Sequence, residues 1–338
     1  MQEILTKLPE RFIENLEYAY AVGRVRALEV SLIDKQRFER LLKAGIEEIG
    51  RILVDTDYSP SLSELLNSAT FETVLQNEKQ RILTLVDSLI YEENVRGFLH
   101  LEFDYFNARV LLKGKIFDRD VSDFLVPFGN LNIDEMKQVF DSEEYDKLPE
   151  NLVEAIQNAI SSYYNLKEPR MIDFSFDRAF IKHLNTAGYP PFLQDYYRLL
   201  TDLTNFRSLL RWKVMELDRS RFRDVLLPGG FIQEGIFLDL IGEPVEQIPG
   251  VFSKWIYYPV FLEGTKYLNT NHSFIRYEAM VEKLLSTYID KTRYLVFGVE
   301  PVIAYYLKKM KEIKNIRIIL VGKFNGVEEE ILAERLVI

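Results

Sequence analysis

The chain contains no cysteine among its 338 residues, and this absence removes several chemistries at once. Disulfide frameworks, thiol nucleophiles, iron–sulfur clusters and cysteine-ligated zinc sites all require that residue. Glycine and proline are also scarce, with 16 and 12 residues, together 28 of 338. Because these two residues interrupt regular structure, their scarcity favours long regular elements, and helices fit it best.

Long apolar runs are missing as well. The longest, such as 294–299 and 318–321, are far shorter than the ~20 residues that a membrane-spanning helix needs. The sequence also opens on no signal-peptide pattern. We therefore expect no transmembrane segment, so that any membrane association is peripheral.

Positive charge is in deficit: 52 acidic residues stand against 42 basic ones, a formal net charge of −10. This charge repels a phosphate backbone, so nucleic acid is not an expected partner. What is present is ordinary globular composition, with 47% apolar residues. The length exceeds what one hydrophobic core usually supports and predicts two or three domains.

One twelve-residue pattern occurs three times. Each copy has an acidic residue, an asparagine three positions later, an arginine at five, two aliphatic residues, and a lysine at eleven. An accidental second copy is an event on the order of 10⁻³ at usual residue frequencies, and a third copy argues strongly against coincidence. The shared residues are Asp104, Asn107, Arg109 and Lys115, then Asp202, Asn205, Arg207 and Lys213, then Glu312, Asn315, Arg317 and Lys323.

A second marker, a leucine with a glycine four positions later, precedes each copy. It occurs as Leu41 with Gly45, Leu125 with Gly129, and Leu226 with Gly230; only the last two have the form Leu-x-Pro-x-Gly. Marker followed by motif predicts three units of about a hundred residues, each the size of a small domain. We therefore predict helical repeat domains at 1–117, 118–217 and 218–338.

The repeat also decides the secondary structure of the last copy. Taken alone, the β-branched stretch 316–321 favours a strand, but its register with the other two copies predicts a helix. Three copies in one chain can close around an approximate three-fold axis, and a linear row of three is also open. Capping-box spacing or a proline in the first turn predicts three further helix starts: Ser61 with Glu64, Asn132 with Glu135, and Pro301.

The repeated polar residues are interpreted as structural and not as a ligand site. An asparagine and the aliphatic residue four positions later share one helix face, so Asn107, Asn205 and Asn315 are expected to satisfy backbone groups of neighbouring helices. The arginines can pair with carboxylates of the preceding helix or with a partner surface. We predict no catalytic, cofactor-binding or metal-binding residue in the motif.

Other candidate sites are weak. Gly114 with Lys115, and Gly322 with Lys323, lack both the earlier glycine and the following Ser or Thr of a phosphate-binding loop. The three histidines have no metal-ligand spacing. The carboxylate pairs Asp118 with Asp123 and Asp218 with Asp224 are interpreted as members of local ion pairs. The aromatic group is interpreted as part of the core; it consists of Trp255, Tyr257, Tyr258 and Phe261.

Longer stretches resemble a known family. Residues 18–42, the motif at Asp104, the stretch 226–230 and the stretch 298–323 are similar to the C subunit of archaeal and bacterial V-type (A-type) ATPases, the relative of the eukaryotic d subunit. The likeness keeps its order over nearly the whole chain. It implies an all-helical, funnel-shaped protein of three similar domains around a pseudo-three-fold axis.

The resemblance also implies a non-catalytic role without a cofactor. In that family the subunit sits on the cytoplasmic end of the proteolipid rotor ring and receives the central-stalk subunits D and F in a socket. It transmits torque between ATP hydrolysis or synthesis and the transport of protons or sodium ions. We therefore expect a peripheral protein at the cytoplasmic face of the membrane, associated with it only through the complex.

Two alternatives stay open: an all-helical enzyme with an acid-rich pocket, and a helical scaffold outside rotary ATPases. An enzyme needs an asymmetric cluster of perturbed groups in one cleft. This chain instead distributes its distinctive residues equally over three units, which favours the rotor subunit.

Overall fold

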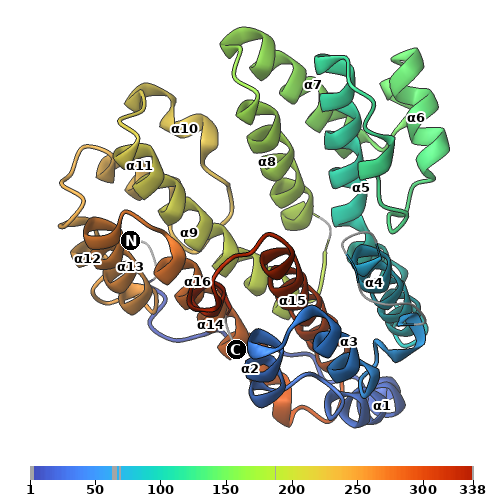
Figure 1. Cartoon of the computed structure of the whole chain (residues 1–338). Helices are drawn as coiled ribbons and strands as arrows, with labels where there is room; N and C mark the ends of the chain where they lie inside the picture. Colours follow the sequence, from blue (N-terminus) through green and yellow to red (C-terminus); the bar gives the residue numbers. More distant parts are fainter. Residues whose placement is uncertain (1–3, 63–66, 68–69, 187, 337–338) are drawn as a thin grey trace. The chain divides into compact units, whose positions relative to one another are not determined.

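A computed structural model describes residues 4–62, 67, 70–186 and 188–336. Within these ranges the chain is all-helical, with no β-strand, which confirms the predicted all-α class (Figure 1). Contacts divide it into two compact units, Met1–Thr6 with Glu92–Trp255, and Lys7–Tyr91 with Ile256–Ile338. The second unit therefore combines an N-terminal segment with a C-terminal segment.

The first unit is built from both long and short helices. Helices α7 and α8 form a hairpin, and α5 packs against both as well as against α6. Its helices are α5 (Glu93–Phe117), α6 (Ile133–Ser142), α7 (Glu150–Leu166), α8 (Arg170–Thr186), α9 (Pro191–Val214), α10 (Phe222–Val225), α11 (Glu234–Leu240) and α12 (Ile248–Val251).

The second unit places α15, another long helix, beside helices from the start of the chain. Helix α15 packs along α4 and also contacts α1, α3, α14 and α16. The helices are α1 (Ala19–Glu29), α2 (Lys35–Lys43), α3 (Ile46–Val54), α4 (Phe71–Asp87), α13 (Tyr258–Asn271), α14 (Ile275–Asp290), α15 (Glu300–Phe324) and α16 (Glu329–Arg335).

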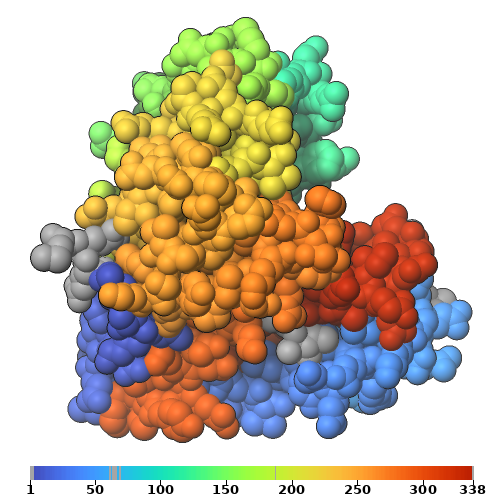
Figure 2. Space-filling model, turned by 90° about the vertical axis from the view of Figure 1, so that its left-hand side faces the viewer, coloured from blue at the N-terminus to red at the C-terminus, as the bar shows by residue number. Residues whose placement is uncertain are grey.

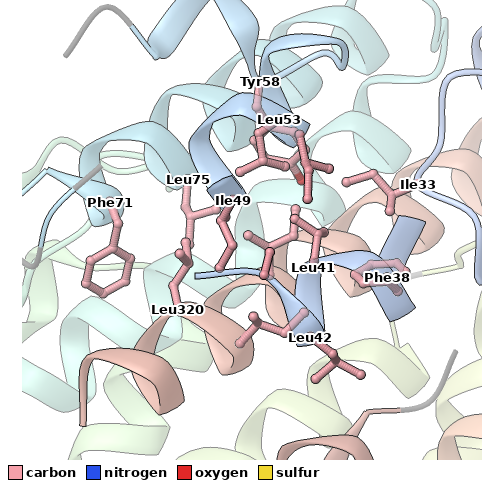
Figure 3. Close-up of a cluster of buried hydrophobic side chains, with 14 of the residues drawn as sticks. Ile33, Phe38, Leu41, Leu42, Ile49, Leu53, Tyr58, Phe71, Leu75 and Leu320 are labelled. Atoms are coloured by element: carbon pink, nitrogen blue, oxygen red, sulfur yellow. The ribbon is translucent and has the colours of Figure 1, made fainter. Parts of the chain in front are cut away.

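The core of the second unit is shared between N-terminal and C-terminal residues. Leu41, Leu53 and Leu75 pack in one buried cluster with Ile316 and Leu320 of α15 (Figure 3). On the surface, red C-terminal residues lie beside light-blue residues of the N-terminal third (Figure 2). The rings of Phe71 and Phe324 are 5.3 Å apart. Neither end of the chain can complete this core by itself.

The predicted helix boundaries agree with the structure where it describes them. The Asn132 side chain accepts hydrogen bonds from the backbone N–H groups of Asp134 and Glu135 and so caps α6. Pro301 lies in the first turn of α15, and the stretch 316–321 is helical. Glu64, the second member of the predicted capping box at Ser61, lies outside the described residues.

Candidate functional site

The acidic residue of each motif copy accepts a hydrogen bond from the backbone just before another helix. Asp104 accepts from the N–H of Leu131 at 2.9 Å, and Asp202 accepts from the N–H of Ile232 at 3.0 Å. Each of these N–H groups lies two residues before the first residue of a helix, α6 in one case and α11 in the other. The motif acid therefore fixes the entry into the next helix.

The glycine of the marker makes room for this acid. A Cβ atom on Gly230 would lie 2.9 Å from Cγ of Asp202 and closer still to Oδ1, and a Cβ on Gly129 would collide with Asp104 in the same way. Both carboxylates are buried. Burial raises the pKa of Asp104, while hydrogen bonds from Leu131 and Asn130 act in the opposite direction. Glycine is the residue type that leaves space for the buried carboxylate.

The motif asparagines hold the marker backbone from the other side. The Asn107 amide exchanges two hydrogen bonds with the backbone of Val126, at 2.8 and 3.0 Å. Asn205 does the same with Leu227, at 2.9 and 2.8 Å. The sequence predicts partners on neighbouring helices, whereas both asparagines satisfy the backbone of the loop that leads to α6 or α11. Asn315 is buried in α15 in the corresponding register.

The lysines of the first two motifs reach the C-terminal end of the helix whose entry the motif acid fixes, α6 or α11. Lys115 donates to the carbonyl of Phe140 in the last turn of α6, and Lys213 donates to the carbonyl of Ile241, which ends α11. Lysine side chains at a helix C-terminus satisfy orphan carbonyls and complement the helix dipole. Eleven residues of helix span about 16 Å. One motif helix therefore clamps the following short helix at both ends.

The third motif makes the equivalent acid contact with the N-terminal part of the chain. Glu312 accepts from the N–H of Ile33 at 2.6 Å, and Ile33 again lies two residues before a helix, α2. The marker assigned at Leu41 does not take this position: Leu41 lies in the core within α2, and a Cβ on Gly45 would meet no atom within 4 Å. Hydrogen bonds thus join the first two motifs to the segments that follow them, whereas the third motif bonds to Ile33 in the N-terminal part of the chain.

The motif arginines pair with acids on other helices. Arg109 bonds Asp177 of α8 at 3.0 Å, and Arg317 bonds Glu72 of α4 at 2.6 Å. Arg207 is half-buried on α9, and Lys323 is half-buried in the last turn of α15. Neither partner lies on the preceding helix that the sequence predicts, because α8 follows α5 in the chain and α4 lies far before α15.

A buried ion network joins α15 to α4, and sequence reasoning did not find it. The Lys309 ammonium lies 2.7 Å from Glu312, 2.9 Å from Glu78 and 3.2 Å from Asp57. Arg81 adds two hydrogen bonds to Glu78, at 2.7 and 2.9 Å, and an ion pair with Asp57 at 3.0 Å. The Lys309 side chain is 0% exposed, so every charge of the network depends on its partners.

The network changes the titration of its members. Burial opposes the charged form of Lys309, but the carboxylates of Glu312 and Glu78 outweigh it and the pKa of Lys309 is raised. The Tyr58 hydroxyl donates to Glu312 at 3.0 Å. Burial, and then the charge of Glu312, raise the pKa of Tyr58 well above its usual value. The network therefore keeps Lys309 charged and Tyr58 neutral.

The other candidate residues do not converge on one place. His100 and His183 bond the Phe128 carbonyl and the Tyr105 hydroxyl, and His272 ends α13. Among the described residues no group of three His, Cys, Asp or Glu side chains is placed to hold a metal ion. Asp118 ends α5, Asp123 lies in a short helical turn, and Asp218 caps another such turn near Asp224 of α10. The aromatic group is largely buried: Trp255, Tyr257 and Phe261 are buried and Tyr258 is half-buried. This burial confirms the prediction that the group belongs to the core.

Open hollows occur on the described part of the chain. One of about 570 Å³ lies between α2 and α3 and has both arginine and acidic side chains in its lining. A smaller pocket of about 270 Å³ lies between α5 and α8 and is lined mainly by aromatic rings. No helix in the described ranges is both long and apolar enough to cross a membrane.

Comparison with known proteins gives a match over most of the chain. A family model described as ATP synthase (C/AC39) subunit matches residues 21–335. The C subunit of the A-type ATP synthase of Methanococcoides burtonii is 25% identical over 95% of this chain and 94% of its own length. The C subunit of the V-type sodium ATPase of Enterococcus hirae is 22% identical over 95% and 98%, and the A-type C subunit of Pyrococcus furiosus is 25% identical over 90% and 85%.

Proposed function

Because this chain belongs to the ATP synthase (C/AC39) subunit family, we propose that it is a non-catalytic rotor subunit that links the central stalk of a rotary V- or A-type ATPase to its membrane ring. The observation that carries the proposal is the family match from residue 21 to residue 335, which leaves little of the chain for another activity. The relatives' names place them in A-type ATP synthases and in a V-type sodium ATPase.

The use of the motif residues supports a mechanical role. Contacts of the first motif hold α6 to α5 through Asp104, Asn107 and Lys115. Contacts of the second motif hold α11 to α9 in the same manner through Asp202, Asn205 and Lys213. A subunit that transmits torque has to resist twisting. Helices clamped at both ends by hydrogen bonds suit that task better than a cleft with perturbed acids would.

We also infer the partners from the proposed role. One surface receives the stalk subunits D and F, and another meets the cytoplasmic side of the proteolipid ring, so the chain is peripheral and reaches the membrane only through the complex. Charge sets register and association rate at such surfaces more than it sets affinity. In a chain with a formal net charge of −10, the attachment is expected to weaken as salt is added.

The three repeat domains 1–117, 118–217 and 218–338 form part of the proposal, as three related copies around a pseudo-three-fold axis. Support comes from the matching bonds of Asp104, Asp202 and Glu312 to the backbone before a helix. The return of the last motif to Ile33 favours a closed arrangement over a linear row.

Removal of the chain from the assembled complex tests the proposal. We expect the soluble catalytic head to keep its ATP hydrolysis while ATP-driven ion pumping by the membrane complex disappears, and adding the purified chain back should restore pumping. The measurement uses proteoliposomes with a pH-sensitive or sodium-sensitive dye. Undiminished pumping without the chain would exclude the linking role.

A further inference from the structure

A pocket of about 220 Å³ lies in the second unit and combines apolar and charged side chains in its lining. It lies where α14 and α15 meet the segment that leads into α2. Its apolar wall includes Ile33 and Phe38, which lie at one edge of the core cluster (Figure 3). Three lysines share the lining with two acids: Lys35, Lys308 and Lys311 with Asp290 and Glu312.

Lys311 is the unusual member of this set. Its ammonium group donates to the hydroxyl oxygen of Ser286 at 2.8 Å, and it is half-buried. Among the described residues no carboxylate forms an ion pair with it. Burial lowers the pKa of Lys311, although the charges of Glu282 and Asp290 act in the opposite direction. A partly desolvated ammonium without a counter-ion is unfavourable unless an anion joins it.

The nearby carboxylates are engaged elsewhere. Glu282 pairs with Lys314 at 2.5 Å, and Asp290 pairs with Lys308 at 3.0 Å. The two oxygens of Glu312 accept from the N–H of Ile33 and from Lys309. The acids around the pocket are therefore already neutralised or hydrogen-bonded, and the lining keeps an excess of one positive charge.

Ser286 supplies a second polar group. Its hydroxyl oxygen accepts the bond from Lys311, and a hydroxyl that accepts one hydrogen bond still has its own proton to donate. An ammonium and a hydroxyl side by side can together bind the two oxygens of a carboxylate. A hydrogen bond between an ammonium and a carboxylate is stronger than one between neutral groups.

We propose that this pocket binds a carboxylate group through Lys311 and Ser286, supplied either by a small free acid or by an aspartate or glutamate side chain of a partner protein. The pocket volume suits a group of a few carbon atoms. The inference does not depend on the rotor role, because it follows from the charges and bonds of the pocket alone.

Titration of the full chain with sodium glutarate, followed by calorimetry at low chloride, tests the proposal. We expect saturable binding at one site. Lys311→Met should weaken it at least about tenfold, because a charge-assisted bond is lost, and Ser286→Ala should weaken it about threefold. Lys283→Met is the control on α14, since Lys283 is exposed and lies outside the pocket lining, and it should bind like the wild type.

Two further probes distinguish a free acid from a partner side chain and test whether the negative charge is required. N-acetylglutamate α-methylamide carries only the side-chain acid; binding of this probe supports a partner side chain, and binding of glutarate alone supports a free acid. Dimethyl glutarate has a similar shape without charge and should not bind. Circular dichroism checks the fold of each variant, and Ser286→Ala carries the test if Lys311→Met does not fold. The proposal is wrong if neither acid binds at 10 mM, if the diester binds equally well, or if the folded variants bind like the wild type.

Discussion

At the scale of single residues, Gly129 and Gly230 are marker positions where one extra carbon atom should be costly. In Gly230→Ala the new Cβ displaces the Asp202 carboxylate, which accepts hydrogen bonds from Phe231 and Ile232. We expect a loss of about 2–4 kcal/mol in the free energy of unfolding, from overpacking and from the buried groups left unpaired. Urea unfolding followed by tryptophan fluorescence measures it, because Trp212 and Trp255 both belong to the first unit.

The control is Gly235→Ala in α11, where a Cβ meets no atom within 4 Å. Alanine is the better helix former, so this variant should be neutral or gain up to about 1 kcal/mol. Equal destabilisation by the two substitutions would show that the Asp202 contact is not the cause.

The roles of the repeated asparagines could be predicted from the sequence, because a buried amide on a helix face has few partners other than backbone. The order of the chain did not predict which backbone. Marker preceded motif three times in the sequence, yet Asn107 and Asn205 hold the markers that follow them. Glu312 reaches Ile33 across nearly the whole chain, and this closure follows from tertiary packing that no local pattern contains.

At the scale of helices, the ion network fixes α15 to α4. Lys309→Met leaves Glu78 and Asp57 with Arg81 as their remaining cation, and it removes the cation that pairs with Glu312. We expect a loss of about 3–5 kcal/mol in stability, because uncompensated buried charge is costly. Thermal unfolding followed by circular dichroism measures it.

Lys314→Met on the same helix is the control for this variant. Lys314 pairs with Glu282 at an exposed position, so its loss should change stability by no more than about 1 kcal/mol. A Lys309→Met variant as stable as this control would show that methionine packing replaces the network at no cost.

Sequence reasoning could not find the network for a physical reason. Its members lie on three separate segments, and only Lys309 with Glu312 and Glu78 with Arg81 have helical spacing. Each of these pairs alone is typical of a solvated helix surface. Their burial depends on α15 lying against α4, two helices more than 200 positions apart in the chain.

The same network predicts a loss of stability at alkaline pH. The pKa of Tyr58 is raised in the folded chain, so the folded state holds its proton more tightly than the unfolded state does. The stabilisation is complete below the unfolded pKa of about 10 and decreases as pH rises above it. We expect Tyr58→Phe to reduce the slope of stability against pH between 10 and 11 by up to about 1.4 kcal/mol per pH unit. An unchanged slope in urea titrations of the variant would contradict this assignment.

At the scale of the whole molecule, the two units differ in how the chain supplies them. Nearly all of the first unit comes from the continuous stretch Glu92–Trp255, whereas the core of the second combines residues 33–75 with residues 313–336. The predicted all-helical class agrees with both units. The prediction of three consecutive repeats does not include a core shared between an N-terminal and a C-terminal segment.

This difference predicts how fragments of the chain behave. Residues 92–255 alone should unfold cooperatively in urea, with a change in tryptophan emission, because their core is complete within the fragment. Residues 256–338 alone should show little cooperative melting, because the apolar face of α15 that includes Ile316 and Leu320 then lacks Leu41, Leu53 and Leu75. Mixing this fragment with residues 7–91 should restore helical circular dichroism and a thermal transition. Cooperative melting of 256–338 by itself would mean that α15 and its C-terminal neighbours form a core without the start of the chain, and the closure through Ile33 and Glu312 would then be dispensable for stability.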